Sequence, residues 1–239
     1  MSANELTIYF STNPPDLWVA HRSALAEAFG TPTLIAAENS SAAEYDPAVS
    51  FDGLTLWFAS NRVANEGFHL YVANRASTLA EFGAPGLAAT VGATDTKQAD
   101  WQPFVTADGG ELWFASTRAG GLGGNDIWHA TSTGNGFAVP SIVPELNSSS
   151  DDFLPTLSAD RLTVYFTSTR TVTGTKGKLD IWTSHRSTVN DGFPGPALAD
   201  ELNTSGNDLA TWLSADNCRM YGASDVSGPS RLYVATRSP

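Results

Sequence analysis

Four acidic residues recur at nearly equal spacing and are the residues whose type could best support chemistry. They are Glu44, Asp100, Asp152 and Asp208, which lie 56, 52 and 56 residues apart. Carboxylates that meet at one point could hold Ca²⁺, which prefers hard oxygen ligands, or a cationic group. Two carboxylates at a suitable separation could also cleave a glycosidic bond. The simpler interpretation is that each carboxylate caps its own turn through backbone N–H groups.

Two tryptophans close to these carboxylates depart from the aromatic pattern of the rest of the chain. Trp101 directly follows Asp100, and Trp212 follows Asp208 by four residues. A ring that leaves the pattern on an innermost strand could line a channel and stack against a sugar or another planar ligand. Packing within a divergent last copy of the repeat is the alternative. We predict the four carboxylates and these two tryptophans as ligand contacts at a channel mouth, and we predict no catalytic residue.

The acidic residues belong to a segment that the chain repeats. The copies read approximately Pro-x-x-Ser-x-Asp-Gly-x-x-Leu-x-Phe-x-Ser-x-Arg, followed by Asp-Ile-Trp or Leu-Tyr-Val-Ala. Asp-Gly between alternating apolar residues, as at 52–53 and 108–109, is a strong β-hairpin signal. Each copy holds four short segments of this kind. A period of this length built only from strands predicts an all-β fold, a β-propeller.

The repeat predicts five four-stranded blades in a single domain that covers residues 1–239, with incomplete first and last blades. Residues 6–39 lack an opening strand, and residues 208–239 lack a closing strand. A fragment of a longer propeller, or closure by a second chain, is the alternative. Open blades would expose strand edges, and such edges favour self-association. We therefore expect either a monomer or a protein that associates with itself through its open blades. The expected repeats are 1–43, 44–99, 100–151, 152–207 and 208–239.

Side chains that recur in every copy are expected to be structural. Ten aromatic residues at two repeat positions should pack blade against blade; they are Tyr9, Trp57, Trp113, Tyr165, Tyr221, Trp18, Tyr71, Trp128, Trp182 and Tyr233. Arg118 with Asp126, and Arg170 with Asp180, are expected to form cross-strand ion pairs. Three asparagines, Asn39, Asn147 and Asn203, are read as turn residues at one point of the repeat.

Composition excludes several classes of partner. The formal net charge is −12 with only 13 basic residues, which argues against nucleic acid and against an anionic membrane surface. No apolar run is long enough to span a membrane, and residues 1–5 do not form a signal peptide. The single cysteine, Cys218, rules out an intramolecular disulfide.

With its Gly-Gly-x-Gly-x-x-Asp-Ile-Trp continuation at 120–128, the repeat resembles the TolB-type (WD-like, "PD") β-propeller repeat. Copies with Glu-Leu-Asn at 145–147 and 201–203 are similar to repeats of bacterial envelope proteins. The likeness fades in the last copy, where Gly222 replaces the phenylalanine and Val226 the arginine. It implies a non-enzymatic scaffold in the periplasm or at the cell surface.

We therefore expect a propeller that binds another molecule, with a protein as the first choice of partner. The first rival is a module that binds a glycan or small ligand, with or without Ca²⁺. The second rival is a glycosidase-like enzyme, since five-bladed propellers host such enzymes. No cofactor other than possible Ca²⁺ is expected.

Overall fold

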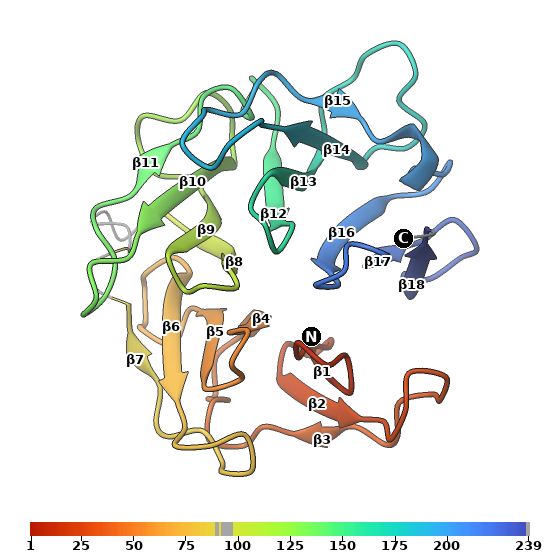
Figure 1. Ribbon diagram of the computed structural model, residues 1–239. Helices are drawn as coiled ribbons and strands as arrows, with labels where there is room; N and C mark the ends of the chain where they lie inside the picture. The colour runs from red at the N-terminus through yellow and green to blue at the C-terminus, as the bar shows by residue number, and fades with distance from the viewer. Residues whose placement is uncertain (89–90, 92–97, 238–239) are drawn as a thin grey trace. The chain divides into compact units, whose positions relative to one another are not determined.

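The computed structural model describes residues 1–88, 91 and 98–237, and nearly all of the regular structure in them is β-strand. The strands form five antiparallel sheets of three or four strands (Figure 1). This is the fold class of a five-bladed β-propeller, as the repeat predicts. The chain forms two compact units: residues 1–112 with 130–140, and residues 113–129 with 141–239. No helix in the described residues is long and apolar enough to cross a membrane.

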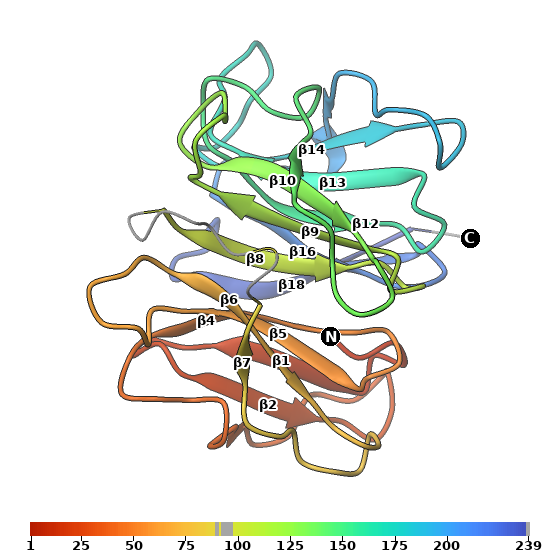
Figure 2. The ribbon, with the colours of Figure 1, turned by 90° about the vertical axis from the view of Figure 1, so that its left-hand side faces the viewer.

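Blades two, three and four each contain four strands, in which the fourth is only two residues long. Figure 2 shows strands β5, β6 and β7 of blade two side by side. Their strands are β4 (Glu44–Val49), β5 (Thr55–Ser60), β6 (His69–Asn74) and β7 (Gly86–Leu87); β8 (Asp100–Val105), β9 (Glu111–Ser116), β10 (Asp126–Thr131) and β11 (Ser141–Ile142); and β12 (Asp152–Leu157), β13 (Thr163–Ser168), β14 (Asp180–His185) and β15 (Ala197–Leu198).

Within the described residues, blades one and five contain three strands each, as the repeat predicts. In this part of the chain, blade one has no counterpart of the first strand and blade five has none of the fourth. Their strands are β1 (Thr7–Ser11), β2 (Leu17–His21) and β3 (Thr33–Leu34); and β16 (Asp208–Leu213), β17 (Arg219–Ser224) and β18 (Arg231–Thr236). A short 3₁₀ helix, η1 (Asp200–Leu202), links blade four to blade five.

The hairpin between the first two strands of a blade is closed by a repeated hydrogen-bond pattern. In blade two the Ser50 hydroxyl donates to Asp52 (2.6 Å), and that carboxylate accepts the Leu54 N–H (2.9 Å). Gly53 has φ +73°, a left-handed conformation that glycine adopts at no steric cost. Blades three, four and five repeat these bonds. The Asp-Gly signal in the sequence therefore reports this turn.

Blade one keeps this turn although it lacks the strand before it. Ser2 donates to the Asn4 side chain (2.8 Å), and the Asn4 oxygen accepts the Leu6 N–H (3.1 Å). Glu5 takes the left-handed position with φ 61°. The turn is therefore present in all five blades.

Neighbouring blades bury apolar faces against each other within each unit. In the first unit, Leu17 and Ile35 of blade one pack with Leu56 and Phe58 of blade two. In the second unit, a smaller cluster joins blade four to blade five; its buried members are Ile181, Ala199, Ala210 and Met220. Burial of such faces is the main stabilising term of a fold made of separate sheets.

Three asparagines connect the third and fourth segments of their blades. In blade four, Asn203 accepts the Ile181 N–H (2.6 Å) and donates to the carbonyls of Ile181 (2.9 Å) and Ala199 (3.1 Å). Asn39 and Asn147 make the same three contacts in blades one and three. The side chain thus extends a two-residue strand pairing, which is more than the turn role predicted from the sequence.

Candidate functional site

The predicted carboxylates open the first strands of blades two to five, and each is buried. Glu44 accepts hydrogen bonds from the Ser40 hydroxyl (2.6 Å), the Ser60 hydroxyl (2.8 Å) and Arg62 (3.3 Å). Asp100 is fully buried at the start of β8. The Glu44 bonds lie within one blade and the loop that enters it. They fit the turn-capping interpretation.

Asp152 and Asp208 repeat this arrangement in the second unit. The Ser148 N–H and hydroxyl donate to Asp152 at 2.6 and 2.8 Å, and Arg170 completes its environment. The Thr204 N–H and hydroxyl donate to Asp208 at 2.6 and 2.9 Å. That the carboxylates of different blades act on one ligand stays a prediction, as does Ca²⁺ binding. In the residues that the structure describes, no three His, Cys, Asp or Glu side chains are grouped to hold a metal ion.

The cross-strand ion pair predicted for Arg170 and Asp180 is wrong, because Arg170 pairs with Asp152. The Asp180 carboxylate turns back to its own loop and accepts the N–H groups of Lys176 and Gly177 at 3.2–3.4 Å. Because these backbone N–H groups occupy the Asp180 carboxylate, Arg170 pairs instead with Asp152 at the start of the blade.

The two unusual tryptophans pack against other aromatic rings. Trp101 stacks on Phe68 with ring centroids 4.0 Å apart and approaches Tyr45 at 6.2 Å. Trp212 meets Tyr221 edge-on at 5.6 Å. Both are half-buried. Their role as ligand contacts stays a prediction.

Residues that precede proline in the first strands form a feature that the sequence reading missed. Asp46, Gln102 and Leu154 have φ between 52° and 56°, a left-handed conformation that is costly for such residues. Burial raises the pKa of Asp46 to about 6, although a hydrogen bond from the Gln102 N–H opposes the shift. The Asp-Pro, Gln-Pro and Leu-Pro dipeptides within strand patterns were the available signal.

A second carboxyl with a raised pKa, that of Glu38, predicts a pH dependence of stability. Burial raises this pKa to about 7, nearby Glu81 adds to the shift, and the Glu38 Oε1 atom has no hydrogen-bond partner. Between pH 4.5 and 7 the folded chain therefore binds more protons than the unfolded chain. The Glu38 contribution to the free energy of unfolding falls as pH rises through this window, by at most roughly 3 kcal/mol in total.

The measurement is urea denaturation of the wild type and of Glu38→Gln at pH 5 and pH 8. Other groups titrate in this range, so the quantity to compare is the difference between the two proteins. We expect Glu38→Gln to gain stability relative to the wild type as pH rises. A difference that does not change with pH would contradict the assignment.

The outermost strand of blade five differs most from its counterparts, because nothing pairs with its free edge in the described residues. Every residue of β18 is exposed. Leu232 is 48% exposed, whereas the equivalent Leu17, Leu70 and Ile127 are fully buried and Ile181 is 4% exposed. Tyr233, predicted to pack between blades, is also exposed, because the residues that the structure describes include no fourth strand to cover it.

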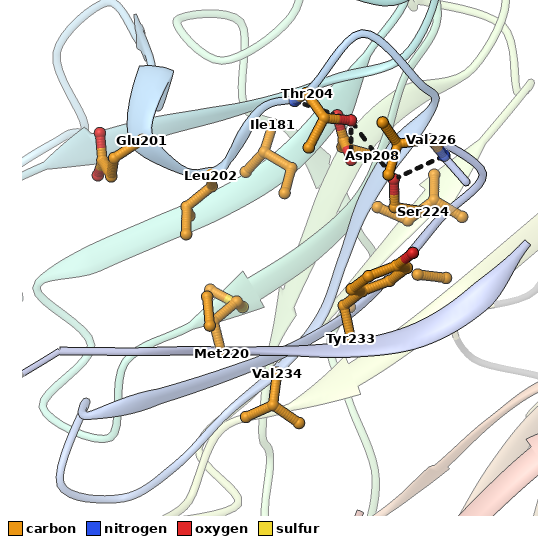
Figure 3. Close-up of a pocket in the computed structure, with 14 residues that line it drawn as sticks. Ile181, Glu201, Leu202, Thr204, Asp208, Met220, Ser224, Val226, Tyr233 and Val234 are labelled. Atoms are coloured by element: carbon orange, nitrogen blue, oxygen red, sulfur yellow. Dashed lines mark hydrogen bonds between the residues drawn. The ribbon is translucent and has the colours of Figure 1, made fainter.

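A pocket of about 170 Å³ lies between blade four and blade five, entirely within the second unit (Figure 3). Its apolar wall includes Leu202, Met220 and Val234. Its polar end holds Asp208 and Ser224, with the Asp208 partner Thr204 beside them. The volume is below that of usual small-molecule sites, about 300–1,000 Å³, and suits a single side chain or a small group.

Comparison with known proteins supports the fold and leaves the activity open. No family model matches the chain, and no curated protein matches it in sequence. Among solved structures, TolB from Acinetobacter baumannii is similar over 99% of this chain and 53% of its own, with 16% identity and a TM-score of 0.55. These values show a common propeller fold. The chain spans about half the length of that TolB.

Two glycoside hydrolases are similar to the same degree. An alpha-L-arabinofuranosidase from Lactobacillus brevis matches 96% of this chain and 90% of its own, with 9% identity and a TM-score of 0.56. A thermostable family-43 glycoside hydrolase matches 98% of this chain and 91% of its own, with 12% identity and a TM-score of 0.56. At such identities the likeness shows the fold alone.

Proposed function

We propose that this chain is a non-enzymatic propeller module that binds a protein partner, and that the partner adds a strand to the free edge of β18. The exposure of Leu232, at a position buried in every other blade, carries the proposal. Addition of an extended segment to an exposed sheet edge is a common mode of peptide recognition. The resemblance to envelope repeats supports a partner in the periplasm or at the cell surface.

The chain itself indicates what such a segment contains. In blades one to four the segment after the third strand reads Phe-x-x-Pro-x-Leu or Phe-x-x-Pro-x-Ile, at 29–34, 82–87, 137–142 and 193–198. Its last residue lies opposite the aromatic residue of the third strand, in the pairs Trp18 with Leu34, Tyr71 with Leu87, Trp128 with Ile142, and Trp182 with Leu198. The same register would place a partner's leucine opposite Tyr233.

Charge complementarity points to the same kind of segment. β18 begins with Arg231 and is followed by Arg237, in a chain of net charge −12. In three of the four blades the fourth segment is followed by a glutamate, namely Glu38, Glu145 or Glu201. A partner segment of this composition would bring its acidic residue to a basic edge.

Binding of a labelled peptide with the sequence of residues 193–203 to the intact protein tests the proposal. We expect saturable binding, weakened at least tenfold by Val234→Pro, which removes an N–H that faces the free edge. In blade one the carbonyls of Leu17 and His21 accept N–H groups of the fourth segment, so Val19, which lies between them, faces the same side. Val234 is the equivalent of Val19 in blade five. Val234→Thr keeps the N–H and should bind as the wild type does. Equal binding to the Val234→Pro and Val234→Thr proteins, with both folded, would refute pairing at β18.

A glycoside hydrolase is the second candidate, supported by the two hydrolases of similar fold. Glycoside cleavage needs two carboxyl groups with unlike environments that reach the substrate. Glu44 and Asp152 have alike environments: each is fully buried, accepts a serine hydroxyl and pairs with an arginine of its own blade. These contacts favour the binding module over the enzyme.

A further inference from the structure

The pocket in blade five corresponds to a place that side chains fill in blade four. There the guanidinium of Arg170 lies over the rings of Phe166 (5.2 Å) and Trp182 (4.9 Å). Its Nε donates to the Ser168 hydroxyl (3.0 Å), and its Nε and Nη2 donate to Asp152. The arrangement combines stacking of the cation on aromatic faces with charge-assisted hydrogen bonds.

Blade two repeats the same arrangement with its own residues. The Arg62 guanidinium lies over Phe58 (5.1 Å) and Tyr71 (4.6 Å). Its Nε donates to the Ser60 hydroxyl (3.1 Å), and its Nη2 pairs with Glu44 (3.3 Å). The guanidinium socket is therefore a repeated element of the chain.

A backbone carbonyl is the third acceptor of each filled socket. The Nη2 of Arg62 donates to the Glu38 carbonyl, and the Nη2 of Arg170 donates to the Leu146 carbonyl. Each of these residues directly precedes the asparagine that joins the third and fourth segments of its blade. In the loop that enters blade five, the equivalent residue is Leu202.

Blade five keeps the acceptors of the socket and has lost the side chains that fill it. Gly222 stands where blade four has Phe166, and Val226 stands where it has Arg170. The three acceptor residues remain as Asp208, Ser224 and Leu202, and all three line the pocket. The pocket is thus a socket without its internal arginine.

Asp208 determines which kind of chemical group the pocket suits. Its side chain is buried, with the residue 3% exposed, and Thr204 is its hydrogen-bond donor. In the described part of the chain no basic side chain pairs with it. A buried carboxylate is favourable only with a partner that offsets its desolvation. We propose that this pocket binds a guanidinium group on an alkyl stem, supplied from outside the chain.

The shape of the site distinguishes a guanidinium from an ammonium group. The filled sockets use donors on Nε and Nη2 at once, and they stack the planar group on a ring. Only the guanidinium has this geometry, since lysine is a point charge. Tyr233 supplies the ring in blade five, and it is 39% exposed beside Val226, which is 43% exposed. Both line the pocket, so a group from solvent can reach it. This inference does not depend on strand pairing at β18.

The test is ligand-observed NMR with Nα-acetyl-arginine methylamide and its lysine analogue. We expect the arginine compound to bind at least ten times more tightly than the lysine compound. Val226→Arg should refill the socket from within, abolish binding and raise the melting temperature. Asp208→Asn should weaken binding at least tenfold. A substitution of Gly222 cannot be used to fill the pocket, because a Cβ at this position would lie 2.3 Å from the Leu209 carbonyl oxygen.

The matched variant Val226→Leu enlarges the side chain without adding a guanidinium group. It should still bind the arginine compound. Equal affinity for arginine and lysine compounds, or unchanged binding in a folded Val226→Arg protein, would overturn the proposal. A pentapeptide Gly-Gly-Arg-Gly-Gly and free agmatine distinguish the sources of the group. Preference for the peptide assigns a partner's arginine, and preference for agmatine assigns a small guanidino compound.

Discussion

Replacement of Arg170 by methionine is expected to lower the free energy of unfolding by about 4 kcal/mol. The Arg170 side chain is 13% exposed, and its partner Asp152 is fully buried. Methionine keeps much of the apolar stem and removes the charged group, which lies over Trp182. The loss then comes from a carboxylate left buried without its cation, which costs more than the attraction of an exposed pair. Urea denaturation followed by the fluorescence of the seven tryptophans measures it.

The control is the exposed ion pair of Lys176 with Asp200, whose side chains are 38% and 72% exposed. Lys176→Met should cost less than about 1 kcal/mol, because solvent screens such pairs. The double variant Asp152→Asn with Arg170→Met should lose less than the sum of its single variants, since neither charge is left alone. Equal losses for Arg170→Met and Lys176→Met would contradict the buried-pair account.

The fold was predictable because its signals are local and occur several times. The Asp52-Gly53 turn, the alternation around Phe58 and the missing strands at both ends follow from the spacing of residues along the chain. Each copy that repeats a pattern adds independent support for the same element. The turn at Ser2 was missed because Asn4 and Glu5 replace the usual Asp-Gly.

Pairing between distant side chains was less predictable. Asp152 and Asp180 are both acidic residues within reach of Arg170 by sequence spacing, and only the folded loop shows that backbone amides occupy Asp180. The pocket had a visible cause in Gly222 and Val226, which break the repeat. That these changes leave a cavity lined by Asp208 depends on packing, and sequence spacing does not report packing.

Replacement of Asn203 by alanine is expected to lower the free energy of unfolding by about 3 kcal/mol. The change leaves the buried Ile181 N–H without an acceptor and removes one hydrogen bond each from the Ile181 and Ala199 carbonyls, which keep the backbone donors Ala199 and Leu202. Each buried group without a partner costs about 1–3 kcal/mol. β14 and β15 pair through only two residues, so few other bonds hold the fourth strand. Urea denaturation and hydrogen exchange at the Ile181 amide measure the loss.

The exchange measurement decides whether the asparagine acts through the backbone or only by filling space. Asn203→Asp keeps an acceptor for the Ile181 N–H and loses the donors to the two carbonyls, so it should protect that amide better than alanine does. Asn190→Ala changes an exposed loop residue and should leave stability within about 0.5 kcal/mol of the wild type. If Asn203→Ala unfolds at the same urea concentration as Asn190→Ala, the asparagine is not what holds the fourth strand. Strand pairing alone would then hold a fourth strand in place. A partner segment would in that case need no asparagine to bind at the free edge of β18.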